Sequence, residues 1–374
     1  MKASQSKHGP VNSEGPEGKK KPEKKRRVPV AVWVIAGILL VLICAVGLVF
    51  NHYYSKMNIN KVLSSGAGLI SPEEEDWKEG LSSEELAGLD DELRKNLESN
   101  LDWDFNNADV TNILLIGVDN DYLPGMNDLG NADGLVLVSI NKTSQKVVMT
   151  SFMRDIYVAM PGAFNTKITM SYHYGGVPVL LDTVEANFGI NVDNYILVNY
   201  LNVIDIVDAV GGVTLDVSAS ELYFMQEKIH NLNYLAGNDW DANIIPTQNE
   251  GTLLLNGVQT AAYMRIRQAG NGDFDRTNRA RDVLLAIKDK VVDMTLLELN
   301  KLADVVLPCI TTDLTQGEIL SLLMNAPSYL KYAVDSNRIP IDGAYDLKNI
   351  YGSVVVIDYE VNRRFLYESI YGTN

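Results

Sequence analysis

A run of 23 residues without a charged side chain, residues 28–50, constrains the fold of this chain more than any other feature. As a helix it would be about 34 Å long, enough to cross a hydrocarbon core of roughly 30 Å. The run is longer than the apolar part of a cleaved signal peptide, about 7–15 residues, and no clear A-x-A cleavage motif follows it. A soluble helix of this length would carry a polar face. We therefore expect a retained transmembrane signal-anchor.

The segment before this run, residues 1–27, carries nine basic and three acidic side chains and is rich in Lys, Pro, Gly and Ser. Such a composition predicts disorder, and a basic flank stays on the cytoplasmic side of a membrane. We expect a single-pass protein of the cell membrane, with its N-terminus in the cytoplasm and the chain beyond about residue 51 outside the cell.

The predicted outer part is strongly acidic. The whole chain has 32 basic and 48 acidic residues, and the tail holds nine of the basic and three of the acidic ones. The rest of the chain therefore carries a net charge of -22. Such a surface disfavours polyanions, so no nucleic-acid partner is expected and any bound anion needs a focused local site. Cys44 lies inside the predicted span and Cys309 lies alone beyond it, so no intramolecular disulfide is expected.

The sequence divides beyond the span into a stalk and one domain. Residues 51–108 are polar and acidic, and leucines at helical spacing between Leu86 and Leu97 predict a short amphipathic helix there. Residues 109–374 mix strand and helix patterns, which predicts a single α/β domain, α-β-α, with a mixed sheet covered on both faces. Strands are expected at 110–121, 133–155 (two strands joined at "NKTSQ"), 194–200, 213–218 and 353–359, and helices at 176–189, 201–212, 256–267, 276–294, 295–307, 315–333 and the C-terminus.

Five of the ten arginines beyond the tail lie in one stretch, "RIRQAGNGDFDRTNRAR", residues 265–281. The pattern predicts a helix end, a glycine-rich loop and the start of a second helix near Arg276. Guanidinium groups hold phosphate oxygens in pairs, and the N–H groups of a helix N-terminus attract the same anions. The stretch therefore suits a pyrophosphate. The alternative is a solvated helix whose arginines pair with Asp273, Asp275 and Asp282.

Two carboxylates occupy the ends of predicted strands, Asp119 after the first strand and Asp133 before the second. Oxygen ligands at strand ends suit Mg²⁺, although turn formation accounts for such aspartates equally well. Arg154 follows another buried strand and is one of few basic groups nearby. No G-x-S-x-G, H-E-x-x-H or G-x-x-x-x-G-K-[ST] motif occurs. The remaining chemistry is phosphoryl transfer by arginines, carboxylates and a hard divalent ion.

Seven stretches resemble, in order and across roughly residues 110–290, the LytR–CpsA–Psr (LCP) family of envelope phosphotransferases: "NILLIGVD", "DGLVLVSIN", "SFMRDIYVAMPG", "KITMSYHYGG", "IVDAVGGVTLDV", "LNGVQTAAYMRIR" and "GDFDRTNRARDVL". The resemblance implies a transferase that takes a glycan from an undecaprenyl-pyrophosphate carrier and moves it, with one phosphate, to a peptidoglycan hydroxyl. Secondary cell-wall or capsular polymer would be attached in this way. The lipid tail would lie in an apolar tunnel of the α/β domain.

The same resemblance implies roles for individual residues. Asp119 and Asp133 would hold Mg²⁺ (or Mn²⁺), and Asp273 would be the acid of the catalytic group, beside Arg265 and Arg267. The implied ligands of the pyrophosphate are Arg154, Arg265, Arg267, Arg276 and Arg279.

The chain departs from the family pattern at three places. Asp121 and Asn131 stand where family members commonly have arginine, and Ala280 stands where they have glutamine. Fewer cations predict weaker phosphate binding or a changed choice of donor or acceptor. Two other functions remain open, a non-catalytic envelope receptor for lipid-linked glycans and a polyprenyl-pyrophosphate hydrolase. A transcription regulator is disfavoured because the short tail has no helix-turn-helix pattern.

Overall fold

The computed structural model describes residues 58–59, 82–98, 107–119, 129–270, 273–292, 294–329, 331–349 and 353–372. The predicted basic tail and membrane span, residues 1–50, lie outside these residues. None of the described helices combines the length and the hydrophobicity that crossing a bilayer requires.

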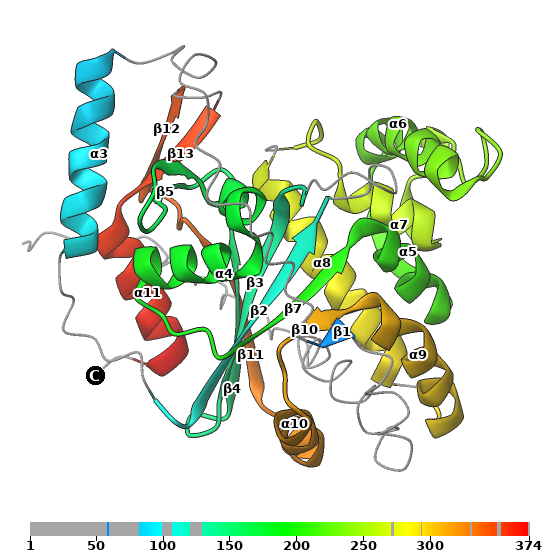
Figure 1. Ribbon diagram of the computed structural model, residues 1–374. Helices are drawn as coiled ribbons and strands as arrows, with labels where there is room; N and C mark the ends of the chain where they lie inside the picture. The colour runs from blue at the N-terminus through cyan, green and yellow to red at the C-terminus, as the bar shows by residue number, and fades with distance from the viewer. Residues whose placement is uncertain are drawn as a thin grey trace, which may run out of the picture.

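A seven-stranded mixed sheet forms the centre of the fold (Figure 1), in the order β1-β10-β7-β2-β3-β4-β11. Neighbours β2, β3 and β4 run antiparallel, whereas β7 is parallel to β2 and β11 is parallel to β4. The prediction of two strands joined at "NKTSQ" is confirmed, because β3 and β4 flank that turn. The strands are β1 (Asn58–Ile59), β2 (Val110–Val118), β3 (Ala132–Asn141), β4 (Lys146–Phe152), β7 (Asn194–Asn199), β10 (Thr311–Thr312) and β11 (Ala333–Ile339).

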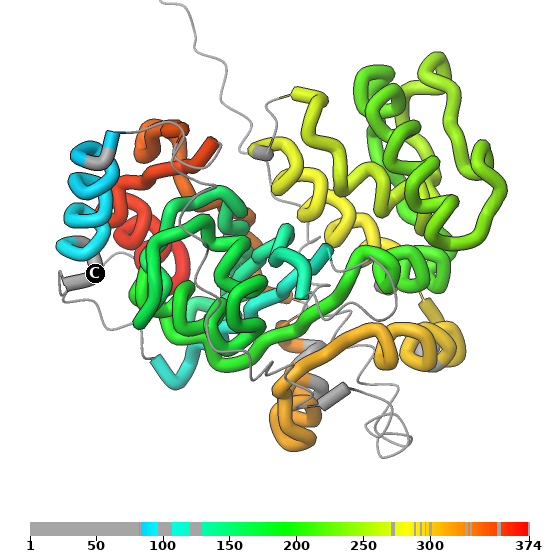
Figure 2. Tube along the Cα trace, turned by 45° about the horizontal axis from the view of Figure 1, so that its top comes forward, coloured from blue at the N-terminus to red at the C-terminus, as the bar shows by residue number. Residues whose placement is uncertain are grey.

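Helices cover both faces of this sheet, because side chains alternate along each strand between two hydrophobic cores. In β2, Leu114 and Ile116 belong to one core and Ile113 to the other. Figures 1 and 2 show the two groups of helices on opposite sides of the sheet. The predicted α/β fold with a mixed, two-sided sheet is confirmed. The helices are α3 (Ser83–Glu98), α4 (Ile168–Phe188) and α11 (Tyr359–Tyr371) on one side, and α5 (Tyr200–Ala209), α6 (Ala219–Ala236), α7 (Gly257–Met264), α8 (Asp273–Val292), α9 (Leu296–Cys309) and α10 (Gln316–Tyr329) on the other.

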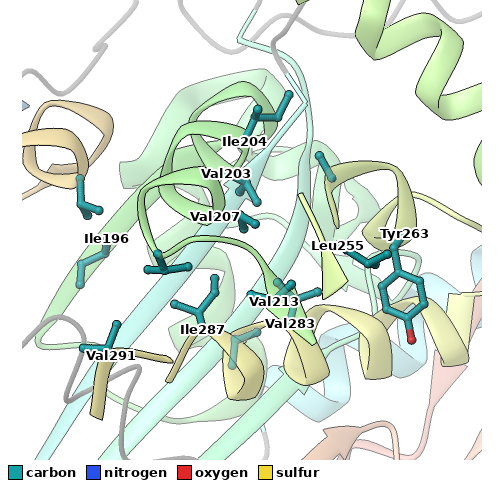
Figure 3. Close-up of a cluster of buried hydrophobic side chains, with 14 of the residues drawn as sticks. Ile196, Val203, Ile204, Val207, Val213, Leu255, Tyr263, Val283, Ile287 and Val291 are labelled. Carbon is teal, nitrogen blue, oxygen red and sulfur yellow. The ribbon is translucent and has the colours of Figure 1, made fainter. Parts of the chain in front are cut away.

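Helices α5, α7 and α8 pack closely in the core on the α5–α10 side of the sheet (Figure 3). Val203 of α5 belongs to this core together with Val283 and Ile287 of α8. A glycine allows α7 to approach α5. A Cβ atom on Gly257 would lie 2.3 Å from the carbonyl oxygen of Ile204, so any larger residue would push the two helices apart. This contact fixes the position of α7 and of the arginines that follow it.

Short two-stranded sheets and one 3-10 helix complete the fold. The pairs are antiparallel and lie outside the central sheet. They are β5 (Tyr157–Ala159) with β6 (Asn165–Lys167), β8 (Val213–Val217) with β9 (Gly251–Leu255), and β12 (Tyr345–Asn349) with β13 (Ser353–Ile357); the 3-10 helix η2 is Thr247–Asn249.

Several element boundaries differ from the sequence prediction. The helix expected in the stalk, α3, packs on the domain: Leu93 is buried, and the Asp90 carboxylate accepts hydrogen bonds from Tyr157 Oη (3.0 Å) and Asn165 Nδ2 (2.6 Å). The described part of the domain therefore begins before residue 109. Helix α8 starts at Asp273, three residues before the expected start, and no prediction covered α6.

A buried asparagine of α4 joins that helix to β5. Asn187 accepts a hydrogen bond from the Ala159 amide (3.0 Å) and donates to the Ala159 carbonyl (2.7 Å) and the Thr183 carbonyl (2.8 Å). Its side chain thus satisfies both main-chain groups of a strand residue.

We expect Asn187→Leu to lower the free energy of unfolding by about 2–3 kcal/mol, because the Ala159 amide and carbonyl would be left buried without partners. Urea denaturation measures the change. The control is Asn231→Leu at an exposed position of α6, where the expected change is within about 0.5 kcal/mol. Equal effects of the two substitutions would contradict this interpretation.

Candidate functional site

The two predicted carboxylates meet at one end of the central sheet. Asp119 directly follows β2 and Asp133 is the second residue of β3. Because these strands are antiparallel, the end of one lies beside the start of the other. The Asp119 amide donates to the Asn131 carbonyl (3.1 Å), and the Asn131 amide donates to Asp119 Oδ1 (2.5 Å). The sheet therefore fixes the two acids next to each other.

The Asp133 carboxylate is the centre of an arginine cluster. Its side chain is 7% exposed and accepts hydrogen bonds from three guanidinium groups of separate segments. Arg154, just beyond β4, donates to Oδ1. Arg267 Nη2 and Arg276 Nη1 each lie 3.2 Å from Oδ2, and Arg276 Nη2 also donates to the Asp133 carbonyl at 3.0 Å. The three arginines lie 21, 134 and 143 residues from Asp133 along the chain, and all of them contact this one carboxylate.

A cavity of about 860 Å³ opens at this cluster. This volume lies in the usual range of small-molecule sites, roughly 300–1,000 Å³. The described lining residues come from the strand ends, from α6 with the loop after it, from the segment that follows α7, and from the first turn of α8. They are Asp119, Asp133, Lys228, Asn231, Tyr234, Leu235, Trp240, Arg265, Arg267, Gln268 and Arg276. Arg154 is not among these lining residues; it belongs to the cluster because its guanidinium group contacts Asp133.

Arg265 lies above an aromatic ring at the floor of the site. It is the C-cap residue of α7, and its guanidinium carbon is 5.2 Å from the centroid of the Tyr200 ring. Burial raises the pKa of Tyr200 to about 12, with Arg276 opposing the shift and Asp133 adding to it. The phenol of Tyr200 therefore stays protonated well above neutral pH.

Two arginines of the same stretch face elsewhere. Arg279 is 4% exposed, and its guanidinium donates to Glu221 Oε1 (2.9 Å), the Ile266 carbonyl (3.0 Å) and the Ala269 carbonyl (3.0 Å). Arg281 donates to Ser151 Oγ (2.7 Å) and Asn278 Oδ1 (2.5 Å), and burial lowers its pKa to about 10. The geometry gives no support to a phosphate contact for Arg279.

The position of Arg279 follows from helix geometry. Residues at i and i+3 differ in direction by about 60° around a helix, so Arg276 can reach Asp133 while Arg279 points to α6. There it holds the loop between α7 and α8 in place. Asp273 begins α8, but its side chain lies outside what the structure describes, as does Asp121.

Sequence reasoning missed one wall of the cavity. Lys228, Asn231, Tyr234 and Leu235 belong to α6, and Trp240 lies in the loop after it. The signal for the helix was Ser218 followed three residues later by Glu221, which form a capping box. The weak apolar periodicity of α6 gave no indication of which side chains would face the site.

An apolar cavity of about 160 Å³ lies behind the polar one, between the sheet and helices α5, α8 and α9. A small space of about 60 Å³ lies between them, since it shares Asp133 and Arg276 with the polar cavity and Gly117, Gly134 and Ala280 with the apolar one. Gly117 and Gly134 pair directly across β2 and β3. We call this small space the neck; three of its residues have little or no side chain.

The site residues fit a hard divalent cation. Mg²⁺ and Mn²⁺ bind proteins through one or two carboxylates and complete their coordination with phosphate oxygens and water. Asp119 supplies one carboxylate, and the buried Asn131 Oδ1 has no hydrogen-bond partner in the described part of the chain. Asp133 accepts hydrogen bonds from three guanidinium groups, so it would supply the second carboxylate only where a bound anion takes over those donors. The described residues contain no cluster of three or more His, Cys, Asp or Glu side chains suited to a metal. A cation here would therefore depend on phosphate for further ligands.

Comparison with known proteins identifies the family. The profile of the LytR_cpsA_psr family matches residues 81–362. The chain belongs to the LytR–CpsA–Psr family. The match begins before α3, in agreement with the packing of that helix on the domain.

Several curated relatives are similar over most of the domain. The polyisoprenyl-teichoic acid–peptidoglycan teichoic acid transferase TagU of Oceanobacillus iheyensis is 29% identical over 270 residues, covering 69% of this chain and 75% of the relative. TagU of Bacillus licheniformis is 32% identical over 216 residues, covering 57% of this chain and 62% of the relative. The regulatory protein MsrR of Staphylococcus aureus is 27% identical over 257 residues, 67% of this chain and 72% of MsrR.

Solved structures share the fold. The structure of TagT bound to LI-WTA superimposes with a TM-score of 0.54 at 22% identity, covering 73% of this chain and 95% of TagT. TagV of B. subtilis gives a TM-score of 0.54 at 23% identity, covering 72% of this chain and 100% of TagV. At this identity the likeness concerns the architecture.

We expect Arg267→Ala and Arg279→Ala to have different effects. Loss of Arg267 removes a charge-assisted contact of about 1.5–3 kcal/mol to a bound anion, so the affinity for inorganic pyrophosphate with Mg²⁺ should fall at least tenfold while unfolding changes little. Loss of Arg279 takes the hydrogen-bond donor from Glu221 Oε1 and from the Ile266 and Ala269 carbonyls, and should cost about 3 kcal/mol of stability. Calorimetric titration and urea denaturation measure the two quantities.

The matched control is Arg94→Ala, which removes an exposed arginine of α3 that pairs with Asp91 at 2.7 Å. It should change neither quantity. The assignment of Arg267 to anion binding fails if Arg267→Ala lowers stability and leaves pyrophosphate affinity intact.

Proposed function

We propose that this LCP protein is a phosphotransferase that moves a glycan phosphate from an undecaprenyl-pyrophosphate carrier to a hydroxyl of peptidoglycan, and so attaches a secondary cell-wall or capsular polymer. The names of the TagU relatives describe a transfer of this kind for teichoic acid. The proposal places the domain outside the cell membrane, anchored by residues 28–50, where carrier and peptidoglycan would both be within reach.

One observation carries the proposal: the neck lies between an arginine-rich polar cavity and an apolar cavity. A lipid pyrophosphate has the same two parts, a doubly charged head and a hydrocarbon chain. The head would lie against Arg265, Arg267 and Arg276, and the first part of the lipid would pass the neck. A soluble nucleotide or sugar phosphate would leave the apolar cavity without an occupant.

The arginine cluster supplies electrostatic stabilisation. Asp133 neutralises part of the charge of Arg154, Arg267 and Arg276. A pyrophosphate would compete for those donors, and the arginines would then stabilise charge that develops on the leaving phosphate. Arg265, held over Tyr200, adds a further cation on the wall of the cavity. Such pre-positioned charges account for most of the catalysis of phosphoryl transfer.

The reaction exchanges one P–O bond for another. The acceptor oxygen would attack the phosphorus next to the glycan, the bond from that phosphorus to the bridging oxygen would break, and the lipid monophosphate would leave with the bonding electrons. A carboxylate, Asp273 in our proposal, would accept the proton of the attacking hydroxyl. Mg²⁺ or Mn²⁺, held by Asp119 and Asp133, would neutralise phosphate charge when bound.

The direct test incubates the full-length chain in detergent with a synthetic undecaprenyl-pyrophosphate glycan, peptidoglycan and Mg²⁺. We expect a phosphodiester between glycan and peptidoglycan, and an equal amount of undecaprenyl phosphate, detected by mass spectrometry. Asp133→Asn should reduce the rate by at least a hundredfold, because it weakens both the metal site and the arrangement of three arginines. Removing Mg²⁺ with a chelator should stop the reaction.

The other possible functions give different products. A hydrolase would release glycan phosphate at the same rate with and without peptidoglycan. A receptor would bind the lipid-linked glycan, yield neither product, and retain binding in Asp119→Asn and Asp133→Asn. Either result would overturn the proposed transfer.

The neck gives an independent prediction. Ala280→Phe places a large side chain between the polar and apolar cavities, so the affinity for undecaprenyl pyrophosphate should fall at least tenfold while that for inorganic pyrophosphate stays within twofold. Calorimetry with both ligands measures this difference, and Ala280→Ser is the conservative control. Equal affinity of Ala280→Phe and the unmodified chain for the lipid would exclude the neck as its path.

A further inference from the structure

Two large aromatic side chains stand exposed at the wall of the polar cavity. Tyr234 is 77% and Trp240 is 57% exposed, and both line the cavity that contains Arg265 and Arg267. Exposed aromatic groups gathered in a hollow are typical of binding surfaces, since folding gains little from them. The mechanism described above assigns neither residue a role.

Trp240 is held with one face covered and the other open. Its ring stacks on His230, with centroids 4.5 Å apart and an angle of 6° between the planes. Its carbonyl accepts hydrogen bonds from His230 Nδ1 (2.8 Å) and Asn233 Nδ2 (3.1 Å). A stacked indole with fixed main chain is a preformed flat surface, so a ligand would bind it without a large loss of side-chain entropy.

Three asparagine side chains, one buried and two half-buried, connect this surface to the arginines. The Asn243 side chain donates to Asn233 Oδ1 (2.8 Å), and Asn256 Nδ2 donates to Asn243 Oδ1 (2.7 Å). Asn256 is the N-cap of α7, and Arg265 is the C-cap of the same helix. The loop with Trp240 and the helix that ends at Arg265 are therefore joined by a continuous chain of hydrogen bonds.

We propose that Trp240 and Tyr234 form a sugar-binding platform for the pyranose ring attached to the lipid pyrophosphate. The ring of a pyranose presents a face of C–H groups, which packs on an aromatic face, and an edge of hydroxyls, which need polar partners. Asn231, Gln268 and Lys228 line the same cavity and supply such partners. This inference rests on the proposed function, because the pyrophosphate on the arginines brings the sugar to the platform.

Paired ligands test the platform on the full-length chain in detergent. Calorimetry compares undecaprenyl pyrophosphate with the same lipid carrying one N-acetylglucosamine. We expect Trp240→Ala to weaken binding of the glycosylated lipid about tenfold, equivalent to about 1.4 kcal/mol, and to leave the sugar-free lipid within twofold. Trp240→Phe, which keeps an aromatic face, should restore most of the affinity.

Tyr223→Ala is the matched control, because Tyr223 is another exposed tyrosine of α6 (63%) that does not line the cavity. It should leave both affinities unchanged, and thermal unfolding of each variant should show that the fold is retained.

The possible outcomes separate the two proposals. If Trp240→Ala lowered the affinity for both lipids equally, the platform would be overturned, because Trp240 would then contact the lipid or have a structural role. No effect on either lipid would overturn it as well. Failure of the unmodified chain to bind the sugar-free lipid, or binding that Arg267→Ala leaves unchanged, would overturn the proposed function and the platform with it.

Discussion

Most of the site depends on the single carboxylate of Asp133, because three guanidinium groups share it. Arginines confined at short distance repel one another, and an acid between them lowers that cost. Asp133 therefore acts as a counter-ion that holds Arg154, Arg267 and Arg276 in place. In the proposed function a phosphate would take over the same donors, which the fold already gathers at one point.

The packing of the fold serves this arrangement. The antiparallel pairing of β2, β3 and β4 brings Asp119, Asp133 and Arg154 to the same end of the sheet. The close contact of α7 with α5, which Gly257 allows, sets the starting point of the segment that carries Arg265 and Arg267. Arg279, which shares the sequence stretch, fixes that segment from behind through Glu221 and two carbonyls. Along this one stretch Arg265, Arg267 and Arg276 line the cavity, whereas Arg279 and Arg281 are buried and bond to other parts of the fold.

The cavities explain how one domain can address a substrate with unlike parts. Polar and apolar spaces normally exclude each other's ligands, but here the paired glycines of β2 and β3 and the small Ala280 line a space that lies between the two cavities. The resemblance of the sequence to the family predicts glutamine at the position of Ala280. The methyl side chain of Ala280 forms no hydrogen bonds, so this part of the neck suits a hydrocarbon chain better than a phosphate. The aromatic wall on α6 and its loop lies at the polar end, where a glycan would be attached.

The sequence by itself determined the α/β class, the main strands and the stretches that contain the arginines and acids, because alternating apolar runs and helical periodicity are local properties. The predicted membrane span and the roles of Asp119, Asp133 and Asp273 stay predictions. Only the tertiary structure decided which arginine faces the cavity: Arg276 and Arg279 are three residues apart, yet helix rotation sends one to Asp133 and the other to Glu221. Trp240 and the neck were likewise beyond sequence reasoning, since both arise where segments distant along the chain pack together.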